Sequence, residues 1–103
     1  MHRGEVWWAH LPAPVGRRPV VLLSRESAYR VRASITVAPV TRRARRIPTE
    51  VALGEPEGMP AACVVNADDI MTVPKDLLRE RLTVLSAGKV KALAEAIRFA
   101  LDL

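Results

Sequence analysis

The sequence predicts a mainly β protein of the α+β class: a small, strongly bent sheet or barrel of five to seven strands, followed by one C-terminal α-helix. Short runs rich in β-branched residues alternate with loops that contain proline and glycine. From Ser86 onward, the spacing of the apolar residues changes from the period of a strand to that of a helix. A length of 103 residues suits one hydrophobic core. We therefore expect a single domain over residues 1–103.

The first two predicted strands carry the most distinctive residues. Residues 4–11 form a β-rich run in which Trp7 and Trp8 point to opposite faces. At most one of these side chains can lie in the core, and the other is available for a dimer interface, which we favour, or for stacking on a base. Residues 19–24 are continuously apolar, as in a strand buried on both faces, and Pro19 fits its first position.

The rest of the chain continues as short strands and turns. Residues 11–16 contain two prolines and a glycine and are expected to form a loop. Residues 25–32 show no clear period, which predicts a loop or a single helical turn. Residues 41–46 form a charged loop, and residues 55–60 a turn. Further strands are expected at residues 33–40, 47–54, 61–66, 70–74 and 80–86.

The predicted helix begins at Ser86, because a serine side chain is a favourable N-cap. Apolar residues recur behind it at helical spacing, whereas Lys91 and Glu95 fall away from that stripe. The stripe expected to face the sheet consists of Val90, Leu93, Ala94, Ile97 and Leu101.

Positive charge is concentrated in the first half of the chain. Residues 1–46 contain ten arginines, no lysine and two acidic residues, a net charge of +8, whereas residues 47–103 have a net charge of −3. Arginine binds phosphate as a planar fork of donors, whereas lysine acts as a point charge. The arginine-rich half indicates a polyanionic partner such as nucleic acid, although a GC-rich coding sequence also favours arginine.

The single cysteine and the lack of long apolar runs restrict the chemistry and the compartment. Cys63 cannot form a disulfide within the chain or a cysteine-based metal cluster, and its apolar neighbours predict a buried thiol rather than a reactive one. No apolar run approaches the ~18 residues that span a membrane, and the N-terminus lacks the apolar core of a signal peptide. We therefore expect a cytoplasmic protein without a membrane segment.

Motifs for metal or covalent catalysis are missing from the sequence. His2 and His10 have no pair of acidic residues at a ligand spacing, and there is no phosphate-binding glycine loop. We therefore predict no metal and no cofactor. RNA can still be cleaved, because its own 2′-hydroxyl is a nucleophile next to the scissile phosphate. That reaction needs donors for the charge that grows on the phosphate, which arginine and threonine can supply.

Two short elements are candidates for those donors. Arg17 and Arg18 stand directly before Pro19, at the start of a predicted strand, and Thr41 follows the next long strand. If these strands are neighbours, Arg18 and Thr41 meet at one rim of the sheet. The alternatives are an ordinary solvated turn for the arginines and backbone capping for Thr41.

The charged loop and one histidine are further candidates for binding RNA. The loop carries Arg42, Arg43, Arg45 and Arg46, which suit phosphate contacts but also an ordinary solvated face. His10 is a candidate for proton transfer or substrate binding, because imidazole is a common proton-transfer group, and the alternative is a structural position at the rim.

Several blocks of the sequence together resemble the MazF/PemK family of toxins from bacterial toxin–antitoxin pairs. The blocks are "RGEVWWAHLPAPVGRRPVVLLS", "ITVAPVT", "IPTEVAL", "GMPAACVVNADDIMTVPKDLL" and "RLTVLS", in this order over nearly the whole chain. The most specific part is the combination of the Arg-Gly-acid-x-Trp opening with the Arg-Pro and Pro-Thr-x-Val strands. The chain departs from the family in a shorter loop before Arg18, in the extra Arg17, and in His10, where an acid is common.

The resemblance implies a fold, an activity and partners. The fold is a small Src-homology-type barrel with added helices, shared with the CcdB gyrase toxins. The activity is metal-independent, sequence-specific cleavage of single-stranded RNA by 2′-hydroxyl attack, which leaves 2′,3′-cyclic phosphate and 5′-hydroxyl ends. The partners are single-stranded RNA, a second copy of the chain in a homodimer, and a cognate MazE-like antitoxin whose extended acidic tail covers the RNA groove.

The resemblance also implies the site. The arginine before the strand-opening proline is Arg18 and the threonine that ends the next long strand is Thr41, so these two are the expected catalytic residues. The expected substrate-binding residues are Arg17, Arg42, Arg43, Arg45, Arg46 and His10. Two other functions remain open: a non-catalytic RNA-binding module that uses the same face, and a gyrase-poisoning toxin of the same fold.

Overall fold

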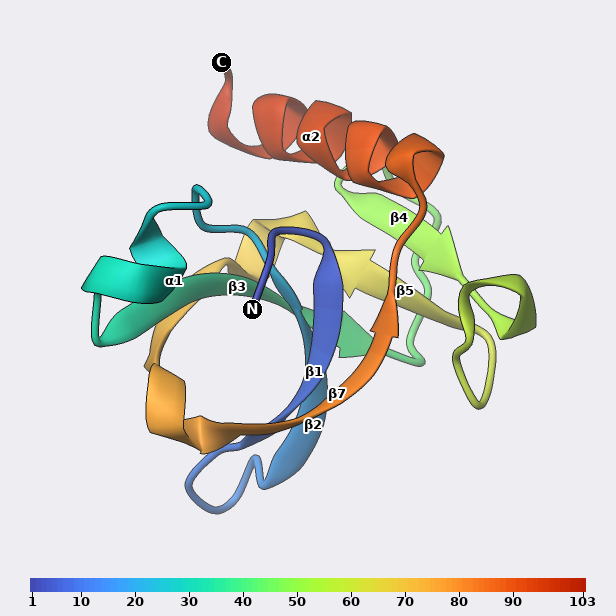
Figure 1. Cartoon of the computed structure of the whole chain (residues 1–103). Coiled ribbons are helices and arrows are strands. Elements are labelled where there is room, and N and C mark those ends of the chain that lie inside the picture. The colour runs from blue at the N-terminus through green and yellow to red at the C-terminus, as the bar shows by residue number, and fades with distance from the viewer.

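A computed structural model describes residues 1–103 as one bent sheet with a long helix against it (Figure 1). The strands are β1 (Glu5–His10), β2 (Arg17–Leu22), β3 (Ser34–Thr41), β4 (Glu50–Leu53), β5 (Cys63–Asn66), β6 (Met71–Pro74) and β7 (Leu78–Val84). The helices are α1 (Ala28–Val31) and α2 (Ala87–Leu101), and three single 3-10 turns are η1 (Glu55–Glu57), η2 (Ala67–Asp69) and η3 (Lys75–Leu77). The mainly β fold and its C-terminal helix are as the sequence predicts.

The strands follow the order β4-β5-β3-β2-β1-β7, and every pair is antiparallel. Strand β3 changes partner along its length, because its first half pairs with β6 and its last two residues pair with β5. Pro39 lies at this change, which suits a residue that has no N–H to donate to a ladder. The change splits the far edge of the sheet and lets the strands curl into the ring seen in Figure 1.

The curled sheet buries apolar side chains on both of its faces. Val21 and Ala38 belong to a cluster that also contains Leu93 of α2. Val20 and Leu22 belong to a second cluster on the other face, which Trp7 borders. Strand β2 is therefore buried on both sides, as its continuous apolar run predicts.

Helix α2 lies against β4 and η2, which places it across one side of the sheet (Figure 1). Its N-cap is Ser86, as predicted, and the serine Oγ accepts the Lys89 N–H at 3.2 Å. The predicted stripe is wrong at its C-terminal end. Leu101 is 56% exposed, and Ala96 is buried beside Leu93 instead. The helix contacts the sheet mainly near β4, so its last turn extends beyond the surface that could cover Leu101.

Several strand boundaries also differ from the predictions, and two of the differences affect the site. Strand β2 begins at Arg17, so Pro19 is its third residue rather than its first. The β2–β3 ladder begins at Val20, so Pro19 lies outside the pairing on that side. Strand β4 begins at Glu50 rather than at residue 47, because residues 47–50 form a turn in which the Glu50 N–H bonds the Ile47 carbonyl at 3.0 Å.

None of the helices has both the length and the apolar character that crossing a bilayer requires.

Candidate active site

Arg18 and Thr41 lie on neighbouring strands and line the same cavity. Val20 pairs with Pro39 in the β2–β3 ladder, so continuing that register by two residues sets Arg18 opposite Thr41. The cavity has a volume of about 350 Å³, and Pro39 contributes the only apolar side chain in its wall. Its lining residues are Arg18, Pro39, Thr41, Arg43, Arg45, Asn66 and Asp69. Three guanidinium groups and a hydroxyl thus surround a space open to an anion.

The two adjacent arginines have different surroundings. The Arg17 guanidinium donates to the Glu80 carboxylate at 2.9 Å and lies 3.9 Å from the centre of the Trp8 ring. Arg18 takes part in none of the ion pairs of the chain and lies half-buried in the wall of the cavity. Consecutive residues of a strand point to opposite faces, so the two guanidinium groups are separated by the sheet.

His10 is not in the wall of this cavity. It pairs with Arg17 in the β1–β2 ladder and therefore faces the same side of the sheet as Arg17. Ala9, the residue before it, pairs with Arg18. The structure thus brings Arg18, Thr41, Arg43 and Arg45 together and places His10 and Arg17 on the opposite face.

The Thr41 hydroxyl has a structural contact and a free donor. Its Oγ1 accepts the Arg43 N–H at 3.2 Å, which turns the chain at the end of β3. Thr41 therefore does cap the backbone at the end of β3, as the alternative interpretation expects. The same hydroxyl keeps its own O–H, because an accepted hydrogen bond uses only a lone pair. Thr41 can shape the turn and donate to a bound anion at the same time.

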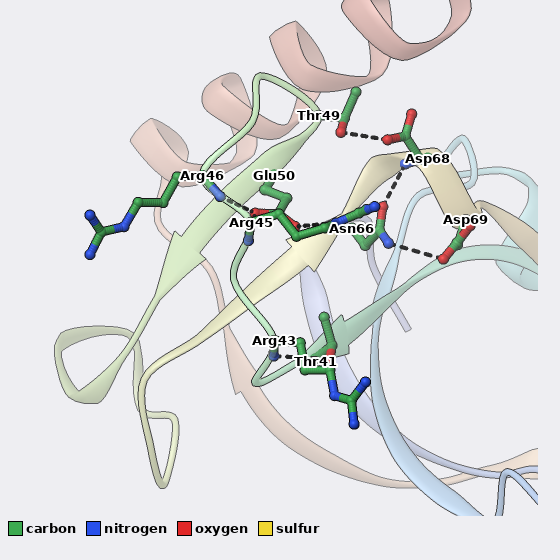
Figure 2. A network of polar contacts seen from close by, with 9 residues as sticks. All are labelled: Thr41, Arg43, Arg45, Arg46, Thr49, Glu50, Asn66, Asp68 and Asp69. Atoms are coloured by element: carbon green, nitrogen blue, oxygen red, sulfur yellow. Dashed lines mark hydrogen bonds and ion pairs between the residues drawn. The ribbon is translucent and has the colours of Figure 1, made fainter.

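Glu50 holds the arginine loop in place beside the cavity (Figure 2). Its carboxylate accepts the backbone N–H of Arg45 at 2.8 Å and that of Arg46 at 2.9 Å. Its second oxygen accepts the Arg45 Nε–H at 3.4 Å, and the side chain of Glu50 is only 3% exposed. Arg46 has a φ of 56°, in the left-handed region, so these contacts fix a backbone turn that a non-glycine residue seldom adopts.

Asn66 and Asp69 also border the cavity, and the sequence analysis did not single them out. The Asn66 Nδ2–H donates to Asp69 at 2.9 Å, and the Asn66 Oδ1 accepts the Asp68 N–H at 2.9 Å (Figure 2). The Thr49 hydroxyl donates to Asp68 at 2.6 Å, and neither of these residues lines the cavity. The signal for such a capped turn is an Asn two residues before a pair of acidic residues, as in Asn66-Ala67-Asp68-Asp69. The place of Asn66 beside Thr41, however, depends on the pairing of β5 with β3.

Glu50 makes the fold sensitive to acid. Burial raises the pKa of its carboxyl, but the N–H groups of Arg45 and Arg46 and the Arg45 guanidinium outweigh burial and lower the pKa below its usual range. A lowered pKa in the folded state contributes stability above the unfolded pKa, and this contribution is lost as the pH falls through the folded value.

We therefore expect Glu50→Gln to unfold more easily than the unchanged protein at pH 7. The difference in unfolding free energy should shrink between about pH 5 and pH 3, as the natural carboxylate becomes protonated. Urea unfolding of both proteins across this range measures the difference. A constant difference at all pH values would mean that the Glu50 charge does not matter.

Two further cavities are lined in part by residues of the arginine loop. One has a volume of about 210 Å³ and shares Thr41 with the cavity around Arg18. The other, of about 300 Å³, lies beside β4 and is lined in part by Arg42 and Arg46. Cys63 borders both and is buried, as predicted, and burial raises the pKa of its thiol. A neutral, buried thiol is a poor nucleophile.

The chain has no group of three or more His, Cys, Asp or Glu side chains placed to hold a metal ion. The charges of the cavity around Arg18 come mostly from arginine, which binds anions rather than cations.

Comparison with known proteins identifies the family. Residues 2–101 match the model of the PemK-like, MazF-like toxins of type II toxin–antitoxin systems. The chain is 41% identical over 103 residues to the probable endoribonuclease MazF5 of Mycobacterium tuberculosis, covering 97% of this chain and 92% of that protein. It is 33% identical to the endoribonuclease MazF of Staphylococcus saprophyticus, covering 100% of this chain and 92% of that protein.

Solved structures agree with this assignment. The toxin MazF-mt6 of Mycobacterium tuberculosis is similar with a TM-score of 0.88 and 35% identity, covering 96% of this chain and 97% of that one. A mycobacterial endoribonuclease in complex with its cognate antitoxin is similar with a TM-score of 0.89 and 29% identity, covering 100% and 96%. The chain therefore belongs to the PemK-like and MazF-like toxins of type II toxin–antitoxin systems.

Proposed function

We propose that the protein is an endoribonuclease toxin that cleaves single-stranded RNA without a metal ion, in the cavity lined by Arg18 and Thr41. The observation that carries the proposal is this mostly polar cavity, where three arginines and a threonine lie around one space together with Pro39, Asn66 and Asp69. The relatives of this family are named endoribonucleases, and the family match over residues 2–101 supports one toxin domain over residues 1–103.

The cavity supplies the electrostatic part of the reaction. The 2′-oxygen of the substrate attacks the neighbouring phosphorus and the bond to the 5′-oxygen breaks, which leaves a 2′,3′-cyclic phosphate and a 5′-hydroxyl. Negative charge grows on the phosphate oxygens, and Arg18 and the Thr41 O–H donate to them. Arg18 acts through its charge, because a guanidinium with a pKa above ~12 is a poor base. We assign to water the proton lost by the 2′-hydroxyl and the one gained by the 5′-oxygen.

The four arginines of the loop line different cavities, so we propose different contacts for them. Arg43 and Arg45 share the cavity with Arg18, so we propose that they hold the scissile phosphate or its neighbours. Arg42 and Arg46 line the adjoining cavities and contact flanking phosphates in this proposal. Each contact of this kind weakens as salt rises, because binding releases counterions from the RNA.

The partners in this proposal are RNA, an antitoxin and a second copy of the chain. One structural relative is an endoribonuclease bound to its cognate antitoxin, and MazE-MazF complexes of Deinococcus radiodurans have the same fold. We propose that a cognate antitoxin with an acidic segment covers the arginine-lined cavity, that the toxin acts as a homodimer, and that it acts in the cytoplasm.

Incubation of the pure protein with total RNA in EDTA tests the proposed function. Discrete fragments that end in 2′,3′-cyclic phosphate and 5′-hydroxyl are the expected result. A salt-dependent mobility shift without cleavage would instead indicate an RNA-binding module. No cleavage and no binding would leave the gyrase-poisoning function, which a DNA supercoiling assay measures directly.

Thr41→Ala is expected to lose most of its cleavage activity while its melting temperature stays close to that of the unchanged protein. The variant removes one donor to the phosphate, and the contact it also removes, from the Arg43 N–H, is solvent-exposed and contributes little to stability. Thr41→Ser keeps the hydroxyl and should recover most of the activity. A large fall in melting temperature for Thr41→Ala would make the residue a structural cap instead.

A further inference from the structure

We propose that the cavity lined by Trp8 is a subsite for one nucleobase of the RNA, the base next to the scissile phosphate, which stacks on the Trp8 ring. The proposal rests on the proposed function, because it needs an RNA bound at Arg18 and Thr41. It adds a binding site for an aromatic heterocycle beside the site for the phosphate.

The subsite adjoins the cavity lined by Arg18 and Thr41, which we call the phosphate cavity. Thr41 lines both cavities, and the subsite has a volume of about 210 Å³. Arg18 lines the phosphate cavity, whereas Pro19, the next residue of β2, lines the subsite. Neighbouring residues of a strand face opposite sides, so the two cavities are separated by little more than the end of β2 and β3. A phosphate at Thr41 therefore has an adjacent base within reach of the subsite.

The Trp8 ring is held ready for stacking. The Arg17 guanidinium lies 3.9 Å from the ring centre and donates to Glu80 at 2.9 Å, yet Arg17 is not in the wall of the subsite. Trp8 pairs with Glu80 and with Pro19 across the two neighbouring strands, so the ion pair spans the ring. An aromatic side chain fixed in this way offers a base a platform at little entropic cost.

The wall of the subsite suits a flat ring with a polar edge. Met59, Pro60 and Ala61 contribute apolar surface, and Arg42 contributes donors at the same cavity. Pockets for drug-sized ligands begin near ~300 Å³, so a smaller cavity suits a single ring system. A phosphate or a carboxylate would gain nothing from the apolar wall, whereas a base can stack on it and accept a hydrogen bond from Arg42. The Arg42 guanidinium has five N–H donors, so it can serve this base and a flanking phosphate together.

The subsite would give Arg17 and Trp8 a role that differs from phosphate binding. Arg17 is then a positioning residue that acts through Trp8, and the base accepted by the subsite contributes to the choice of cleavage sequence. Loss of Trp8 stacking should reduce cleavage only for substrates that have a base to place there.

The test is a double-mutant cycle between protein and RNA. A short RNA with one mapped cleavage site is made with an abasic ribose at each position that flanks the scissile phosphate, and kcat/KM is measured in EDTA. The unchanged protein should lose roughly 10- to 100-fold on one of these abasic substrates. Trp8→Leu should lose the same roughly 10- to 100-fold in kcat/KM on the intact RNA, and it should lose little more on the abasic RNA. Trp7→Phe is the matched control, because Trp7 borders the core on the opposite face, and it should show the full abasic loss.

A second measurement needs no Trp8 variant that has to fold. In Trp7→Phe, Trp8 is the only tryptophan, and its fluorescence is measured as RNA binds. The RNA carries a methylated 2′-hydroxyl at the cleavage position, and quenching by the intact RNA is compared with quenching by the abasic RNA. Two results together would overturn the subsite while cleavage itself still occurs. The losses in kcat/KM caused by the abasic RNA and by Trp8→Leu would be independent and would multiply, and intact and abasic RNA would quench Trp8 fluorescence equally. If Trp8→Leu cleaves normally but resists the antitoxin, the cavity holds an antitoxin side chain instead. If the unchanged protein cleaves no RNA, the proposed function and the subsite fall together.

Discussion

Arg18→Ala is expected to lower RNA cleavage by at least ~100-fold, the scale for the loss of one well-placed donor to a developing anion. The guanidinium has no ion-pair partner in the chain, and it lines the cavity together with Thr41. Its charge is therefore available to the substrate rather than to the fold. The measurement is kcat/KM on a short RNA with one cleavage site, with a melting curve to show that the variant remains folded.

Arg17→Ala is the matched control for this variant, since it removes the same side chain one residue earlier. It breaks an exposed ion pair with Glu80, and such pairs contribute only about 0.2–1 kcal/mol. Arg17→Ala should lower cleavage less than Arg18→Ala does. Its loss should depend on the base in the subsite, as the loss in Trp8→Leu does. An inactive Arg17→Ala beside a normally active Arg18→Ala would show that the catalytic arginine is Arg17.

Gly4→Ala is expected to destabilise the fold by roughly 2–6 kcal/mol. Gly4 has a φ of 91°, and holding another residue in such a conformation costs about 1–3 kcal/mol. An added Cβ would also lie 2.7 Å from the Val90 Cγ2, and overpacking of this kind costs about 1–3 kcal/mol more. The melting temperature should fall by at least ~8 °C.

Gly88→Ala is the control, and its expected effect has the opposite sign. Gly88 lies within α2, and its added Cβ would meet only the Ser86 Oγ at 3.8 Å. Alanine is the better helix former, so this variant should gain about 0.5–1 kcal/mol. Equal melting temperatures for Gly4→Ala and the unchanged protein would mean that the N-terminus and α2 can move apart at no cost.

The glycine of the Arg-Gly-acid-x-Trp opening therefore has a physical reason in this fold. Its N–H bonds the Leu22 carbonyl at 2.9 Å, and its carbonyl accepts the Leu85 N–H at 3.0 Å. One residue thus joins the end of β2 to the segment that leads into α2. The sequence motif marks this position, but the contact with Val90 depends on where α2 packs.

The two arginines before Pro19 illustrate what a local pattern leaves open. As two residues of a turn they look alike, and the sequence could not assign them different partners. Because β2 begins at Arg17, strand alternation sends Arg18 to the cavity and Arg17 to Trp8 and Glu80. Glu80 is 63 residues away in the chain, so only the pairing of β1 with β7 brings it to Arg17.

Glu50 and Asn66 were missed at the sequence level for a related reason. Glu50 looks like an ordinary polar residue within the predicted strand of residues 47–54, and Asn66 like one at the end of the predicted strand of residues 61–66. Glu50 is recognisable as the residue that holds the arginine loop only once that loop folds back over it, and Asn66 reaches the cavity through the β3–β5 pairing. Their roles come from long-range contacts, which residue spacing does not record.

The sequence by itself determined the mainly β fold, the family, the C-terminal helix with its Ser86 cap, and the concentration of arginine in the first half of the chain. These depend on periodicity, on turn residues and on composition, which are local properties. Only the tertiary structure decided which arginine faces the cavity beside Thr41, that His10 lies on the other face, and that Trp8 borders a cavity of its own. Those outcomes depend on strand register and on the change of partner along β3, where a shift of one residue would turn every side chain to the opposite face.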